Sequence, residues 1–237
     1  MSLREMKIKI FADGADLDSI SAAYEEGLVK GFTTNPTLMS RAGITNYLAF
    51  AEEVLKIVRD LPVSFEVFSD DFAEMQVQAL KLAALAPNVH VKIPITNTSG
   101  VSAAPLIGEL SRRGLQLNVT AITTVQQVKQ VAEVLSPSSS CFVSVFAGRI
   151  ADTGMDPVPL MQECLEVIRP LPKAELLWAS PREALNIVQA EMMGCHIITV
   201  TPDVLAKAKL FGRDLTEVSL STVKMFYTDA LKSGFSL

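Results

Sequence analysis

Side chains able to do chemistry recur at nearly regular intervals along this sequence, each directly after a short apolar run. They include one amine, two carboxylates, one guanidinium and two amides. In chain order they are Asp13, Asn35, Glu66, Lys92, Asn118, Phe146 with Arg149, and Ser180. Brought together, such groups could attack a carbonyl carbon, move protons and hold an anion. The pattern therefore predicts a single site assembled from many segments of the chain.

Lys92 is the most informative of these residues because it lies in the alternating segment 90–94. Side chains alternate between the two faces of a strand, so Lys92 points into a barrel if Val91 and Ile93 face outward toward helices. Desolvation favours the neutral form of an amine, and a neutral amine attacks carbonyl carbon. Lys92 is therefore a candidate for Schiff-base formation. The alternative is a structural lysine paired with one of the two carboxylates.

The two carboxylates also have structural alternatives. Asp13 could cap the helix that follows it, but Asp16 or Asp18 can do this and leave Asp13 free. Glu66 follows a strand and does not directly precede a helix, which favours general acid or base catalysis. Both carboxylates are thus candidates for proton transfer.

The remaining polar groups divide between structure and substrate binding. Asn35 could form only an Asx turn before Pro36. Arg149 could make a surface ion pair, although a guanidinium at a barrel rim is also what a phosphorylated or other anionic substrate needs. His90 and His196 are the only histidines and have no partner at ligand spacing, so no metal site is predicted. Nucleotide-binding and serine-hydrolase motifs do not occur.

Alternation of short apolar runs with segments of helical period predicts the elements that position these groups. The expected strands are 7–12, 31–34, 63–67, 90–94, 115–119, 141–146, 176–179 and 197–200. The expected helices are 16–26, 46–60, 71–85, 101–113, 124–135, 157–168, 181–193 and 202–210. This order predicts one α/β domain over residues 1–237, a (β/α)8 TIM barrel with an additional C-terminal helix at 216–232. A six- to eight-stranded open sheet is the alternative. In a barrel the active site lies at the carboxyl ends of the strands, where the polar groups recur.

Composition and charge exclude several classes of function. The chain has 237 residues, of which 49% are hydrophobic and 20% charged, with a net charge of −5. No basic run exceeds two residues, so neither nucleic acid nor an anionic membrane is an expected partner. Apolar stretches fall short of the ~20 residues that a membrane helix needs. A charged N-terminus and three widely separated cysteines predict a cytoplasmic protein with free thiols.

Six short motifs together resemble the transaldolase family, and the chain length resembles its short branch, which also contains fructose 6-phosphate aldolases. The motifs are Phe11-Ala12-Asp13, Thr33-Thr34-Asn35-Pro36-Thr37, Ser64-Phe65-Glu66-Val67, Val91-Lys92-Ile93-Pro94, Asn118-Val119-Thr120 and Phe146-Ala147-Gly148-Arg149-Ile150. They follow the family's order over nearly the whole chain. The resemblance implies a (β/α)8 barrel, no cofactor, and sugar phosphates as substrates.

The resemblance also implies roles for individual residues. Lys92 would form a Schiff base with the ketose carbonyl, and Asp13 would exchange a proton with the hydroxyl next to the bond that breaks. Glu66 and Thr120 would hold a water that relays protons. The expected substrate-binding residues are Thr33, Asn35, Asn118, Ser144, Phe146, Arg149, Ser180 and Arg182. Of these, Asn35 and Asn118 would hold the dihydroxyacetone hydroxyls.

Two positions distinguish the branches of the family. Aldolases have glutamine at the position of Glu66 and tyrosine at that of Phe146, so both residues here resemble those of transaldolases. We therefore expect transfer of a dihydroxyacetone unit from fructose 6-phosphate to erythrose 4-phosphate. An aldolase that releases dihydroxyacetone is the alternative. The segment 178–182 is shorter than its family counterpart, which leaves room for a specialised member acting on a modified ketose. A barrel that only binds an anionic metabolite is a further alternative.

The segment 216–232 contains more large apolar residues than is usual for a terminal helix. Short members of the resembled family form pentamer-based rings, sometimes stacked as decamers, in which this segment packs across subunits. The resemblance therefore implies a homo-oligomer. The alternative is a helix that lies only on its own barrel.

Overall fold

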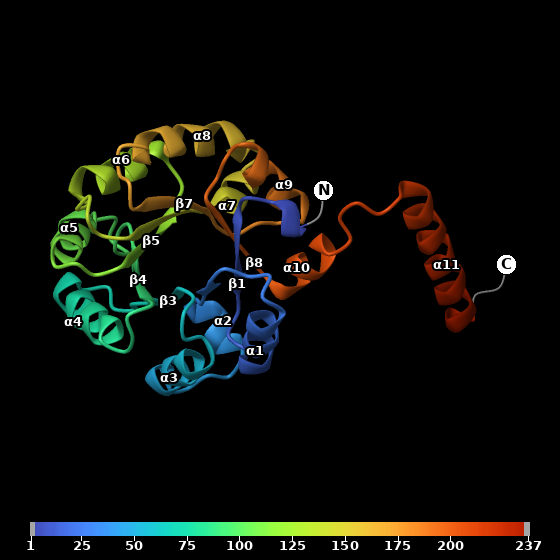
Figure 1. Ribbon diagram of the computed structural model, residues 1–237, viewed down its shortest axis with the longest axis horizontal. Helices are drawn as coiled ribbons and strands as arrows, with labels where there is room; N and C mark the ends of the chain where they lie inside the picture. The colour runs from blue at the N-terminus through green and yellow to red at the C-terminus, as the bar shows by residue number, and fades with distance from the viewer. Residues whose placement is uncertain (1–2, 235–237) are drawn as a thin grey trace.

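The computed structural model describes residues 3–234 and forms a closed barrel of eight parallel strands, paired in sequence order with β8 beside β1 (Figure 1). The strands are β1 Lys9–Asp13, β2 Phe32–Thr33, β3 Val63–Glu66, β4 Val89–Pro94, β5 Leu117–Ile122, β6 Cys141–Val145, β7 Ala174–Trp178 and β8 Ile197–Val200. The prediction of a (β/α)8 barrel is confirmed, and the open sheet is wrong. The predicted domain limits at residues 1 and 237 lie outside the described residues.

One helix of the outer layer follows each strand (Figure 1). These helices are α1 Leu17–Glu26, α3 Tyr47–Ile57, α4 Phe72–Ala83, α5 Ala104–Arg112, α6 Val125–Val134, α8 Pro157–Ile168, α9 Leu185–Met192 and α10 Pro202–Ala208. Asp16 caps α1 by accepting a hydrogen bond from the Ser19 amide, and Gly27 ends it in the left-handed conformation. Apolar strand side chains such as Val91 and Ile93 are completely buried beneath this layer.

Short additional helices follow two of the strands. Helix α2, Pro36–Arg41, comes directly after β2, and helix α7, Ala147–Ala151, comes directly after β6. Asn35 caps α2 by accepting a hydrogen bond from the Leu38 amide at 2.9 Å. Neither helix is long enough to show a periodic apolar stripe, which explains why the sequence did not predict them. A 3₁₀ turn at Leu3–Glu5 precedes the first strand.

The start of α9 and the end of β5 differ from the sequence-based prediction. Ser180 has a positive φ of 59°, and α9 begins at Leu185, so the Ser180-Pro181 pair lies in a loop and does not start the helix. Strand β5 continues past the predicted end at residue 119, with a register shift before Ile122 and a positive φ of 61° at Ala121. Bulges of this kind re-aim side chains near active sites.

Aromatic and aliphatic side chains fill the lower part of the barrel. Phe11 and Phe142 meet edge to face with ring centroids 5.4 Å apart, and Leu177 and Ile197 pack in the same buried cluster. A Cβ at Gly31, directly before β2, would lie 2.5 Å from the Phe11 ring, so this position favours glycine. The interior is therefore solid below the carboxyl ends of the strands.

The last helix, α11 Leu215–Ser233, stands apart from the barrel (Figure 1). It has no buried residue, and large apolar side chains along it are exposed, for example Leu215 at 81% and Phe226 at 63%. The additional C-terminal helix is confirmed, and the alternative that it lies on its own barrel is wrong. Within residues 3–234, no helix is both long and apolar enough to cross a membrane.

Candidate active site

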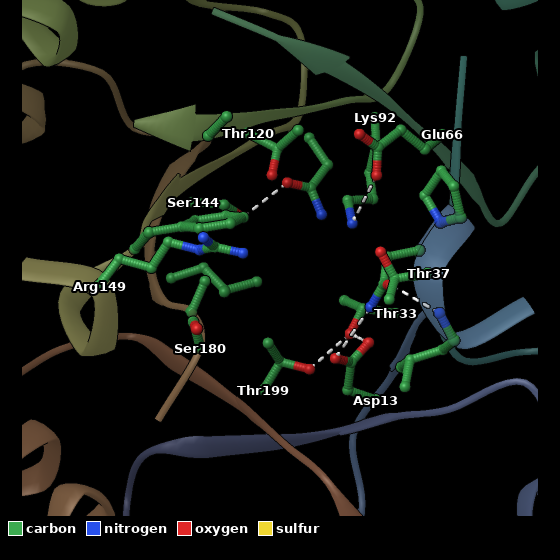
Figure 2. Close-up of a pocket in the computed structure, with 18 of the residues that line it drawn as sticks. Asp13, Thr33, Thr37, Glu66, Lys92, Thr120, Ser144, Arg149, Ser180 and Thr199 are labelled. Atoms are coloured by element: carbon green, nitrogen blue, oxygen red, sulfur yellow. Dashed lines mark hydrogen bonds and ion pairs between the residues drawn. The ribbon is translucent and has the colours of Figure 1, made fainter. Parts of the chain in front are cut away.

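A cavity of about 610 Å³ opens at the carboxyl ends of the strands (Figure 2). Every residue predicted for the site lies on its wall: Asp13, Thr33, Asn35, Glu66, Lys92, Asn118, Thr120, Ser144, Phe146, Arg149, Ser180 and Arg182. The strands and the loops after them contribute side chains from all around the barrel. The cavity is thus lined by ionisable and hydrogen-bonding groups that are far apart in the sequence.

Lys92 projects from β4 into this cavity with its side chain only 8% exposed. Its Nζ lies 3.1 Å from Oε2 of Glu66 and donates a hydrogen bond to the Thr34 carbonyl at 2.8 Å. Strand register explains the ion pair, because Glu66 on β3 is directly opposite Lys92. The amine is therefore held beside an acid and next to open space, rather than in bulk solvent.

Asp13, at the end of β1, faces the same cavity (Figure 2). Oδ1 accepts a hydrogen bond from Thr33 Oγ1 at 2.9 Å, and Oδ2 lies 3.4 Å from the donating Asn35 amide. Burial raises the pKa of Asp13 above its usual range, while the nearby Lys92 and the Thr33 hydrogen bond oppose that rise. Since Asp16 caps α1, Asp13 has no capping role and remains available for proton transfer.

A buried hydrogen-bonded row on neighbouring strands fixes the Asn118 amide. Its Nδ2 donates to Ser64 Oγ at 3.0 Å, and its Oδ1 accepts from Ser144 Oγ at 2.6 Å. Thr120 lies further along β5, and its buried Oγ1 has no hydrogen-bond partner among the described residues. Buried hydroxyls without a protein partner commonly bind water or ligand. Thr120 therefore presents a free polar atom at the cavity wall.

Two arginines, Arg149 of α7 and Arg182 of the loop after β7, line one side of the cavity, and Figure 2 shows Arg149 there. Arg149 lies over the Phe146 ring, with 5.9 Å between the guanidinium carbon and the ring centroid. Arg182 is engaged with Asp152, to which its Nε donates at 2.9 Å, and it also donates to Ser180 Oγ. Within residues 3–234, Arg149 has no ion pair closer than 4 Å. Of these two arginines, Arg149 is therefore the one better placed to receive an anion.

The cavity wall also includes polar residues that the sequence analysis missed. Thr199 on β8 shares a 2.5 Å hydrogen bond with Thr33, which joins it indirectly to Asp13. Alternation along β8 places it on the same face as the inward Ile197, but its position inside an apolar run concealed it. Thr37 and Arg41 come from α2, which the sequence did not predict. Thr37 stood in a quoted motif without being assigned to the site, and no local signal in the sequence identified Arg41.

The cysteines and histidines lie elsewhere. Burial raises the pKa of the Cys141, Cys164 and Cys195 thiols to about 12, so none is a ready nucleophile. Burial also lowers the pKa of His90 to about 4, and its ring stacks on Phe142. Among residues 3–234, no three His, Cys, Asp or Glu side chains gather closely enough to hold a metal ion.

Comparison with known proteins relates this chain to one family. Residues 10–235 match the family model described as Transaldolase/Fructose-6-phosphate aldolase. A protein of Pelotomaculum thermopropionicum named "Probable transaldolase" is 34% identical over 223 residues, covering 94% of this chain and 97% of the relative. One of Nitrosopumilus maritimus with the same name is 36% identical, covering 90% and 91%.

Solved structures show the same architecture at low identity. The structure of 3-hexulose-6-phosphate synthase from Salmonella typhimurium aligns with a TM-score of 0.57 at 15% identity, covering 83% of this chain and 89% of that one. A likeness at this identity shows the fold alone. The family match over most of the chain and the curated relatives are more specific. The chain therefore belongs to the transaldolase/fructose-6-phosphate aldolase family.

Proposed function

We propose that this protein transfers a dihydroxyacetone unit from a ketose to an aldose through a Schiff base on Lys92. The observation that carries the proposal is the Lys92 amine, held 3.1 Å from Glu66 in a polar cavity that Asp13 also lines. A protonated imine withdraws electrons from the neighbouring carbon, which allows carbon–carbon cleavage without a metal or a cofactor.

The first half-reaction forms the imine and breaks the sugar. The neutral Lys92 amine adds to C2 of the ketose, and the adduct loses water to give a protonated imine. A water held by Glu66 and Thr120 carries the protons of this step. The Asp13 carboxylate then removes the proton from the C4 hydroxyl, the C3–C4 bond breaks, and its electron pair moves into the imine to form an enamine. The shortened sugar leaves as an aldehyde.

The second half-reaction runs these steps in reverse on another aldehyde. Carbon C3 of the enamine attacks the carbonyl carbon of the aldose, and Asp13 returns its proton to the new hydroxyl. Water then hydrolyses the imine and frees Lys92. Burial raises the pKa of Asp13, which makes its ionised form a stronger base than an exposed aspartate. The carboxyl is thus suited to both halves of the cycle.

Substrate binding is assigned to the rest of the cavity wall. The side chains of Asn35 and Asn118 bind the hydroxyls of the dihydroxyacetone unit. Thr33 and Asn35 donate hydrogen bonds to Asp13, and Ser144 donates one to Asn118, which fixes these side chains. Arg149 binds the substrate phosphate, assisted by the residues after β7, Ser180 and Arg182. We propose fructose 6-phosphate as the donor and erythrose 4-phosphate as the acceptor, in the cytoplasm.

Phe146 supports transfer over release of dihydroxyacetone. Its ring lines the cavity and carries no hydroxyl that could protonate the enamine. An enamine that is not protonated survives until an aldehyde arrives. The alternative, an aldolase that releases dihydroxyacetone, requires another acid to protonate that carbon.

Borohydride trapping tests the Schiff base. Reduction of the wild-type protein with fructose 6-phosphate should give a secondary amine on the peptide that contains Lys92, identified by mass spectrometry. Lys92→Arg should abolish the adduct and lower kcat by more than about 10³-fold, because guanidinium is not a nucleophile. Lys9→Arg is the matched control, since Lys9 also pairs with a glutamate, Glu175, but lies at the other end of β1. Comparable turnover by Lys92→Arg would disprove the mechanism.

A donor and acceptor screen separates the alternatives. Fructose 6-phosphate consumed only when erythrose 4-phosphate is present indicates transfer, whereas dihydroxyacetone released at full rate without an acceptor indicates the lyase. Fructose without phosphate and a ketose with another anionic substituent belong in the same screen, because Arg182 is already paired with Asp152. Preference for the modified ketose would favour a specialised member of the family.

We also propose that the barrel and α11 form one functional domain in a homo-oligomer, a pentamer or a decamer. Supporting this, α11 exposes large apolar side chains along its length, including Leu220, Val223 and Leu231. A row of large exposed apolar side chains such as this is usually covered by a partner. A second copy of the chain is the proposed partner.

A further inference from the structure

The hydrogen-bond ladder between β2 and β3 stops beside the Lys92 amine. Its last regular rungs are Phe32 N–H to Pro62 O at 2.8 Å and Thr34 N–H to Ser64 O at 3.2 Å. In a parallel ladder, the next rung would join the Glu66 N–H to the Thr34 carbonyl. No such bond occurs among the described residues. The Glu66 N–H and the Thr34 carbonyl are therefore left without their ladder partners at the site.

Pro36 explains why the ladder cannot continue. The rung after the missing one would need an N–H from residue 36 to bind the Glu66 carbonyl, and proline has no N–H. The chain begins α2 at this proline instead. Both backbone groups of Glu66 on the β2 side thus require a partner from elsewhere, because buried peptide groups are costly to leave unpaired.

Tyr47 supplies that partner with a single atom. Its hydroxyl accepts a hydrogen bond from the Glu66 N–H at 2.7 Å and donates one to the Glu66 carbonyl at 2.8 Å. The ring is braced edge-on by Phe65 and Phe68, with centroids 6.4 and 5.5 Å away. Tyr47 is the first residue of α3, whose preceding residue Asn46 caps the helix. The first turn of α3 therefore takes the place of the β2 neighbour that β3 lacks at Glu66.

Lys92 binds the other backbone group of the missing rung, the Thr34 carbonyl. The Thr34 carbonyl, which a regular ladder would give to Glu66, accepts from Lys92 Nζ at 2.8 Å. The same Nζ lies 3.1 Å from the Glu66 carboxylate. The Thr34 carbonyl is therefore available to the amine because the β2–β3 ladder ends here, and Tyr47 holds the backbone of the amine's other partner, Glu66.

We propose that Tyr47 is a positioning residue for the reaction: its hydroxyl clamps the backbone of Glu66 so that the carboxylate stays against the Lys92 amine. This inference deepens the proposed function and depends on it for its catalytic consequence. Tyr47 itself does not line the cavity, so it acts only through Glu66. Burial raises the pKa of Tyr47 far above its usual value, so the hydroxyl keeps its donor proton over the working pH range.

Tyr47→Phe is the direct test, because it removes the hydroxyl and keeps the ring between Phe65 and Phe68. We expect kcat to fall by about 10-fold with KM nearly unchanged, since the lost contact positions a reacting group and does not touch substrate. Tyr24→Phe is the matched control: its hydroxyl also makes a hydrogen bond, to Asp60 at 2.6 Å, but far from the cavity. Equal kcat for Tyr47→Phe and Tyr24→Phe would overturn the proposal.

A double-mutant cycle separates positioning from general stabilisation. Tyr47→Phe should lower kcat by less than about 2-fold in a Glu66→Gln background, because the group that it positions no longer ionises. If the two losses multiply, Tyr47 does not act through Glu66 and the proposal is wrong. Circular dichroism and thermal unfolding of each variant establish that it is folded.

Amide hydrogen exchange gives an answer that does not require turnover. In Tyr47→Phe the Glu66 N–H loses its acceptor, so its exchange, followed by NMR, should accelerate by at least about 10-fold relative to the wild type. The Val67 amide, which bonds to the Lys92 carbonyl, is the internal control and should not change. Unchanged exchange at Glu66 would overturn the proposal. Trapping on the wild type tests the Schiff base separately, so failure of one inference is distinguishable from failure of the other.

Discussion

At the scale of single residues, the environment of Asp13 sets the expected response to pH. Burial raises the pKa of its carboxyl, and neighbouring donors only partly oppose this. The folded protein therefore binds a proton at Asp13 more tightly than the unfolded chain does. It follows that ionising Asp13 costs stability: the free energy of unfolding falls as pH rises from the usual aspartate pKa to the raised one, and stays lower above it.

Asp13→Asn should therefore raise the unfolding temperature at pH 7 while lowering kcat by about 10²-fold or more, because the proposed acid–base group is lost. The gain in stability should disappear below about pH 3.8, where Asp13 is protonated in both states. Thermal unfolding from pH 3 to 8 together with steady-state rates measures both effects.

Asp16 provides a control, because its pKa is shifted in the opposite direction to that of Asp13. Hydrogen bonds from Ser19 lower the pKa of its carboxyl, so its ionised form stabilises the fold above the usual aspartate pKa. Asp16→Asn should not raise stability at pH 7 and should leave kcat unchanged. If Asp13→Asn is no more stable than the wild type at pH 7, the burial argument for Asp13 is wrong.

Much of the site could be predicted from local pattern, and the rest depends on contacts between distant segments. Alternation in 90–94 placed Lys92 inside the barrel, and polar residues after each apolar run marked most of the wall. Tyr47 gave no such signal, because its role exists only where α3 meets Glu66 of β3, beyond the point at which β2 ends. Arg41 was missed for a related reason, since α2 is too short to be periodic.

At the scale of elements, α7 and the loop after β7 are in backbone contact at Gly148. A Cβ at this position would lie 1.6 Å from the Ser180 carbonyl oxygen, a distance that no side chain can occupy. The next residue of α7, Arg149, carries the guanidinium proposed to bind phosphate. Glycine at position 148 therefore fixes how far the loop and the arginine can approach each other.

Gly148→Ala should lower the free energy of unfolding by about 1–3 kcal/mol and displace the loop, because backbone must move to relieve the overlap. We expect KM for a phosphorylated ketose to rise more than KM for its unphosphorylated form. Chemical denaturation and steady-state kinetics measure the two effects. Gly14→Ala is the matched control, since its Cβ would meet nothing within 4 Å. Equal stabilities of the two variants would contradict the overlap.

The elements themselves show where sequence reasoning succeeds. Eight strand-and-helix units were predictable because each helix has an apolar stripe and several have a capping residue, as Asp16 does for α1. The beginning of α9 was not, since the Ser180-Pro181 pair has the composition of a helix start but a left-handed serine. The backbone amides of Arg182 and Glu183 donate hydrogen bonds to the Asn186 side chain instead. Ser180 also lies against Gly148 of α7, a tertiary contact that no local sequence pattern reveals.

At the scale of the whole molecule, α11 predicts association in solution. Phe226→Glu, placed on the apolar part of the helix, should dissociate the proposed oligomer toward the 25.7 kDa single chain, because it buries a charge at an interface. Thr228→Glu is the control, since it lies on the other side of the helix and is exposed. Light scattering after size-exclusion chromatography measures the mass. A wild-type monomer would contradict the prediction.

The packed aromatic floor formed by Phe11 and Phe142 has a kinetic consequence. Because side chains fill the other end of the barrel, the aldehyde that leaves in the proposed transfer and the aldehyde that replaces it must use the same opening, one after the other. Double-reciprocal plots of initial rate at several concentrations of both sugars should then be parallel lines. Each aldehyde should compete with the other for the same cavity.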